Sequence, residues 1–104
     1  MTIPLTRQDL QSMYLQFMVQ KQEQLSKLVQ DETEFIRTNI LKLNNDGLKT
    51  YNITYASTFC DYVDEFIQLL LIKLKEIFID SYITNEKRVV NDMDKIFIGI
   101  DWAI

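Results

Sequence analysis

Apolar residues recur every three or four positions through the first two fifths of the chain, the spacing that places them on one face of an α-helix. Thr6 followed three residues later by Asp9 matches a capping box, which satisfies the first free backbone amides of a helix. Gly47 supplies the left-handed backbone that ends many helices. The sequence therefore predicts one amphipathic helix over residues 6–46. Its apolar positions are Leu10, Met13, Tyr14, Phe17, Met18, Leu25, Leu28, Val29, Phe35, Ile36, Ile40 and Leu43.

This first helix is long for a chain of 104 residues. At 1.5 Å per residue, about 40 residues extend roughly 60 Å, more than a single domain of this size can cover. We therefore expect part of the helix to project from the domain or to bend.

The hydrophobic period changes to two after Gly47. Tyr51, Ile53 and Tyr55 alternate with threonine and asparagine, which is typical of a strand with one apolar face. We predict this strand over residues 48–55.

A second helical pattern follows. Ser57 or Thr58 is expected to begin the helix, with Asp61 as the capping partner of Thr58. This helix has two apolar stripes, and Leu69 and Ile72 flank the second one. Together they form an apolar arc wider than a helix on one face of a sheet needs, so we expect the helix to pack against two partners. The core stripe comprises Phe59, Val63, Phe66, Leu70, Leu74 and Ile77, and the second stripe comprises Ile67, Leu71 and Phe78.

The last quarter of the chain predicts a β-hairpin. An extended run ends at Val90, residues 91–94 supply turn-forming Asn and Asp, and residues 95–104 form the final strand. In that strand Ile96, Ile98, Ile100 and Trp102 fall on one face. The predicted fold is therefore α+β, in the order α-β-α-β-β. It comprises one domain over residues 1–104 whose core at 47–104 is a three-stranded sheet packed by the second helix.

The charge, the cysteine content and the apolar runs of the chain argue against several classes of function. The net charge of −4 repels a phosphate backbone unless basic residues cluster, and Lys87 and Arg88 are the one adjacent basic pair. A single cysteine cannot form an internal disulfide, which favours a reducing, cytoplasmic compartment. The first eleven residues lack the charged and apolar regions of a secretory signal, and no apolar run reaches membrane-spanning length.

The sequence lacks several of the residue types and spacings that catalytic sites usually use. The chain has no histidine, which removes the usual general base and the commonest zinc ligand. Cys60 has no basic neighbour in sequence, so we interpret it as a buried structural thiol. Helix starts and turns account for the acidic groups of residues 61–65 and 92–94. We expect no catalytic, metal or cofactor site.

Surplus apolar surface on both helices instead favours binding to another protein, and a homodimer or other homo-oligomer is our leading hypothesis. In the first helix Leu10, Tyr14 and Phe17, then Leu25 and Leu28, approximate a spacing of 3.5, although Lys21 and Glu32 interrupt it and no sustained heptad follows. Its polar face carries few lysines, which argues against binding to a membrane surface. The expected interface residues are Leu10, Tyr14, Phe17, Leu25, Leu28, Ile67, Leu71 and Phe78.

The order of these features resembles short uncharacterised proteins encoded by large double-stranded DNA viruses. The features that carry the resemblance are a long helix rich in Gln and Glu, Gly47 before an aromatic strand, a Leu-rich helix closing on Ile77, Phe78, Asp80 and Ser81, and the terminal Ile98, Ile100, Asp101 and Trp102. The resemblance implies a virus-encoded accessory or virion protein in the host cytoplasm, and it transfers no functional residue.

The sequence thus predicts a non-enzymatic protein–protein interaction or structural module that self-associates, with another viral protein as a further possible partner. The alternative is an accessory subunit or regulator of nucleic-acid machinery that binds through Lys87, Arg88 and Lys95. An enzyme ranks third, and a pocket with converging carboxylates would revive it.

Overall fold

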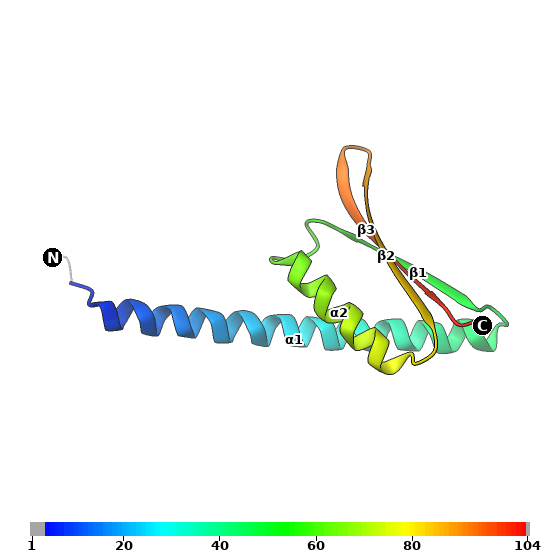
Figure 1. The fold of residues 1–104 in the computed structure, drawn as a ribbon, viewed down its shortest axis with the longest axis horizontal. Helices are drawn as coiled ribbons and strands as arrows, with labels where there is room; N and C mark the ends of the chain where they lie inside the picture. Colours follow the sequence, from blue (N-terminus) through cyan, green and yellow to red (C-terminus); the bar gives the residue numbers. More distant parts are fainter. Residues whose placement is uncertain (1–3, 104) are drawn as a thin grey trace.

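The structure is a computed structural model that describes residues 4–103 (Figure 1). It confirms the predicted α+β fold and the α-β-α-β-β order. The final strand ends at Asp101, so the predicted extension through Trp102 and Ala103 is wrong, and Ile104 lies outside the described residues. The elements are α1 (Arg7–Asn45), β1 (Thr50–Ala56), α2 (Val63–Ile77), β2 (Tyr82–Val90) and β3 (Met93–Asp101).

Helix α1 is continuous over 39 residues and begins and ends as its sequence predicts. The Thr6 hydroxyl accepts a hydrogen bond from the Asp9 amide, and the Asp9 carboxylate accepts one from the Thr6 amide, both at 3.1 Å. At the other end Gly47 has φ +85°. The Leu48 amide donates to the Leu43 carbonyl, and the Gly47 amide donates to the Asn44 carbonyl, which is a Schellman motif.

The three strands form one antiparallel sheet in the order β1-β3-β2, so the last strand lies at the centre. Ile96, Ile98 and Ile100 of β3 are buried on one face, which confirms the predicted alternation. Asn91 and Asp92 both have positive φ and join β2 to β3 in two residues, the geometry of a type I′ turn. Strand β3 therefore starts at Met93, two residues earlier than the longer turn that we expected.

Helix α2 lies beside the later part of α1, and both helices pack on the isoleucine face of the sheet (Figure 1). Two hydrogen bonds join α1 to β1: the Tyr55 hydroxyl donates to Glu32 at 2.9 Å, and the Asn39 amide donates to the Tyr51 hydroxyl at 3.2 Å. The core comprises Leu25, Val29, Ile36, Ile40, Tyr55, Phe66, Ile67, Leu70, Leu74, Ile96, Ile98 and Ile100.

The predicted start of the second helix is wrong. Helix α2 begins at Val63, after Tyr62, which adopts left-handed backbone with φ 60° and provides no side-chain cap. The preceding residues form a turn because β3 and the core hold them: the Ser57 amide donates to the Asp94 carbonyl, and the Phe59 ring contacts Tyr55 with centroids 4.9 Å apart. Tertiary contacts here override a local capping signal.

The molecule is elongated, with extents of 67 × 32 × 18 Å and a radius of gyration of 18.5 Å. A compact chain of this length would have a radius of gyration of about 13 Å. The difference arises because the first third of α1 extends past the sheet and α2 (Figure 1). The helix thus projects, as its length predicts, and does not bend back onto the domain.

Candidate interaction surface

The most unusual surface of the protein is the part of α1 that extends beyond the rest of the fold, residues 7–20, which we call the projecting segment (Figure 1). Every residue from Pro4 to Phe17 is exposed. No residue between Leu10 and Gln20 carries a charge. A solvated helix normally has a charged outer face, so this segment has the composition of a helix that is covered.

Six large apolar side chains of the projecting segment are exposed, in two strips. The first strip follows the spacing i, i+3, i+4, i+7, and the second follows i, i+4, so each strip lies along one side of the helix. The first strip consists of Leu10, Met13, Tyr14 and Phe17, and the second strip consists of Leu15 and Val19.

The projecting segment is anchored where α1 meets the start of α2. Lys21 forms an ion pair with Glu65, with Nζ and Oε1 2.7 Å apart, and its ammonium lies 3.9 Å from the centroid of the Tyr62 ring. The Lys21 side chain is 13% exposed, so this ion pair is better shielded than most surface pairs. Phe17 stands edge-on to Tyr62, with centroids 6.4 Å apart. The segment therefore continues a helix that is fixed at this junction.

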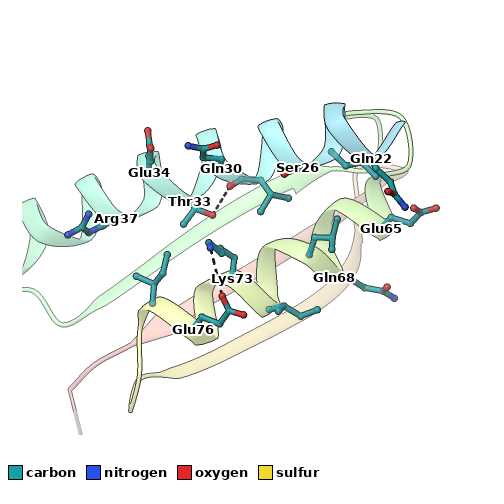
Figure 2. Close-up of a pocket in the computed structure, with 15 residues that line it drawn as sticks. Gln22, Ser26, Gln30, Thr33, Glu34, Arg37, Glu65, Gln68, Lys73 and Glu76 are labelled. Carbon is teal, nitrogen blue, oxygen red and sulfur yellow. Dashed lines mark hydrogen bonds and ion pairs between the residues drawn. The ribbon is translucent and has the colours of Figure 1, made fainter. Parts of the chain in front are cut away.

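A groove runs between α1 and α2 (Figure 2). Its volume is about 890 Å³. Leu25 and Val29 line it from α1, and Leu69, Ile72 and Ile77 line it from α2. Those three α2 residues are exposed. The groove therefore offers apolar surface that the chain itself does not cover.

Charged and amide side chains surround this apolar lining. Figure 2 shows Gln22 and Glu65 at one end of the groove and Arg37 towards the other. Lys73 and Glu76 form an ion pair at 3.8 Å, and both remain more than half exposed. The charges of the groove thus stay in contact with water.

The predicted interface residues fall into two groups. Leu10, Tyr14 and Phe17 are exposed in the first strip, where a partner can reach them. Five others are committed to the chain's own fold: Leu25 and Ile67 lie in the core, and Leu28, Leu71 and Phe78 pack against it. Helix α2 needs its wide apolar arc because it contacts both α1 and the sheet.

Sequence reasoning missed Leu15 and Val19 as candidate interface residues. The signal that could have identified them is the run without charge from Leu10 to Gln20, which the helical stripe alone does not reveal.

The total accessible surface is 8069 Å². The size scaling of monomeric proteins gives about 6,100 Å² for a compact chain of 12.4 kDa. The chain thus exposes about 1,900 Å² more than a compact monomer would. A standard protein–protein interface buries about 800 Å² on each partner, so the excess is large enough for one or two such contacts.

Cys60 and the acidic side chains are the remaining candidates for chemistry. Burial raises the pKa of the Cys60 thiol, and the neighbouring Asp61 carboxylate adds to the effect, so this thiol is not activated. Within residues 4–103, no three metal-ligating side chains come close enough to hold an ion.

The basic residues of the hairpin are divided between the two faces of the sheet, because Lys87 and Arg88 are neighbours on one strand. Strand pairing places Arg88 opposite Lys95. Arg88 forms an ion pair with Glu86 and lies over the Phe97 ring, and the Lys87 ammonium lies 3.9 Å from an Asp64 carboxylate oxygen. Two of the three basic residues thus lie close to an acidic group, which weakens the attraction of the hairpin for a phosphate backbone.

Comparisons with protein-family models, with curated proteins and with solved structures find no match for this chain. Of the helices that the structure describes, none has both the length and the apolar character needed to cross a membrane.

Proposed function

We propose that this protein is a protein–protein interaction module that self-associates through the projecting segment of α1. The observation that carries the proposal is the uncharged run from Leu10 to Gln20, whose two apolar strips are exposed on one continuous helix. Exposed apolar patches of more than a few hundred Å² are uncommon on monomers and mark interaction sites.

The helical state of this segment also points to a partner. In folded proteins, most of the stability of a helix comes from the tertiary packing of its apolar face. The projecting segment has no ion pair of its own and no packing before Phe17. A partner that covers the apolar strips would supply the missing stabilisation.

A second copy of the chain is the partner that we favour. Most soluble oligomers are symmetric homo-oligomers, and the excess surface is sufficient for an interface of standard size. Membrane-surface helices attract anionic lipid through lysine and arginine. The polar positions of the projecting segment are mostly glutamine, and Arg7 is offset by Asp9. A lipid surface therefore has little to bind.

The biological role follows from the resemblance noted in the sequence. We propose a non-enzymatic, virus-encoded accessory or virion protein that assembles in the host cytoplasm. The support for this is the resemblance together with the shape of the molecule, a small domain that presents a long apolar helix.

The test is a pair of double variants studied by sedimentation equilibrium. Tyr14→Glu with Leu15→Glu adds one carboxylate to each strip, and we expect it to convert an oligomer into a monomer. Gln16→Glu with Gln20→Glu adds the same charge to exposed positions outside the strips and serves as the control, which should remain oligomeric. Oligomers of equal stability from both variants would exclude the projecting segment as the interface.

A further inference from the structure

The second strip of the projecting segment continues into the groove between α1 and α2. Steps of three or four residues back from Ser26, which lines the groove, lead to Gln22, Val19 and Leu15. Leu15 and Val19, which are 63% and 55% exposed, therefore lie on the groove side of α1. The same side of α1 is therefore exposed and apolar along the projecting segment. Further along the helix, this side borders the groove.

The two parts match in length. Residues 7–20 span roughly 21 Å at 1.5 Å per residue, and the groove residues of α1, from Gln22 to Arg37, span roughly 24 Å. The groove can thus receive the whole projecting segment along its length. In one copy of the chain, the projecting segment and the groove are successive parts of the same helix. The segment therefore cannot reach the groove of its own chain.

We propose that the groove receives the projecting segment of a second copy, and that two copies exchange segments about a two-fold axis crossing α1 near Lys21. The proposal rests on the self-association proposed above and names its receiving surface. In this dimer the two α1 helices run antiparallel, and Leu15 of each copy lies against Ser26 and Leu69 of the partner subunit. The exchange is reciprocal, so it closes into a dimer and does not grow into a filament.

The chemistry of the two surfaces suits this contact. The segment brings no charge between Leu10 and Gln20, so docking buries no charged side chain from it. Leu15 and Val19 would cover the exposed Leu69 and Ile72. Glutamines lie on both surfaces and can exchange hydrogen bonds with one another at the edges of the contact.

Engineered cysteines test this arrangement in the full chain. In a Cys60→Ser background, Leu15→Cys and Ser26→Cys are eleven residues apart on one straight helix, roughly 16 Å. A disulfide requires Cα atoms within about 7 Å, so these two cysteines can be joined only between chains. We expect mild oxidation to give a covalent dimer on a non-reducing gel. The matched control pairs Leu15→Cys with Gln24→Cys, an exposed position on the opposite side of α1, and should stay monomeric on the gel.

Single charge variants provide the second measurement. Leu15→Glu should weaken the dimer more than roughly 30-fold, because it removes the leucine contact and also places a carboxylate in an apolar groove. Tyr14→Glu should leave the dimer intact, because the first strip faces away from the groove. The reverse result would overturn the groove assignment, as would equal cross-linking of both cysteine pairs, while self-association through the segment would stand. A monomer at every concentration of the unmodified chain would overturn both proposals.

Discussion

The hydrogen bond between Tyr55 and Glu32 predicts a measurable loss of stability when the hydroxyl is removed. Tyr55 is 3% exposed, and its ring stands edge-on to Phe59 and Phe66. Tyr55→Phe keeps this aromatic packing and deletes only the hydroxyl that donates to the Glu32 carboxylate at 2.9 Å. The bond holds β1 against α1, so its loss reports on the packing between helix and sheet.

The size of the effect follows from the partners. Hydrogen bonds to charged groups contribute about 1.5–3 kcal/mol, and Glu32 is half-buried, so water can replace part of the loss. We expect Tyr55→Phe to lower the free energy of unfolding by about 1–1.5 kcal/mol, or roughly 5–10 °C in Tm. Tyr51→Phe is the matched comparison, because its hydroxyl pairs with the neutral Asn39 amide at 3.2 Å, and it should cost only about 0.5 kcal/mol.

Urea unfolding at one protein concentration measures these differences in the free energy of unfolding. The dependence of the unfolding free energy on pH provides a second test. Burial, and then the hydrogen bond to Glu32, raise the pKa of Tyr55 above its ordinary value of 10.0. The folded protein therefore keeps the phenol neutral where the unfolded chain ionises. The neutral Tyr55 phenol therefore contributes its full share to the free energy of unfolding below pH 10, and this share is lost as the pH rises above 10. The stability difference between wild type and Tyr55→Phe should narrow above pH 10. Equal stability of the two proteins at pH 7 would refute the assigned bond.

Three further predictions concern the projecting segment, the end of α1 and the hairpin. Leu15→Ala should remove about 1 kcal/mol of apolar contact from each copy, which raises the Kd of a dimer roughly 30-fold in sedimentation while the urea midpoint of the monomer is unchanged. Gly47→Ala should lower the free energy of unfolding by about 1 kcal/mol in urea titrations, because its φ of +85° disfavours a side chain. The unmodified chain should elute from a DNA column at low salt, because Lys87 and Arg88 already have acidic partners.

Much of the fold could be predicted from local patterns. The ends of α1 are encoded by short-range contacts, Thr6 with Asp9 and the left-handed Gly47, and the structure confirms both. The alternation of Ile96, Ile98 and Ile100 likewise fixes which face of β3 is buried. These signals depend on residues that are close in sequence, so they can be recognised without knowledge of the tertiary structure.

The start of α2 and the surface candidates depend on contacts that sequence spacing does not reveal. Residues 57–62 form a turn because Ser57 pairs with β3 and Phe59 packs on Tyr55. The sequence pattern placed Ile67 in the second apolar stripe as an expected interface residue, but its side chain is only 5% exposed because α2 contacts both α1 and the sheet. The uncharged run could have identified Leu15 and Val19 as candidates, but their place on the same side of α1 as the groove depends on the packing of α2, which spacing does not reveal.

The molar mass of the unmodified chain, measured by light scattering across the micromolar concentration range, tests the central claim most directly. Self-association through the projecting segment predicts a mass that rises from 12.4 kDa to twice that value as the concentration increases. A mass of 12.4 kDa at every concentration would contradict it.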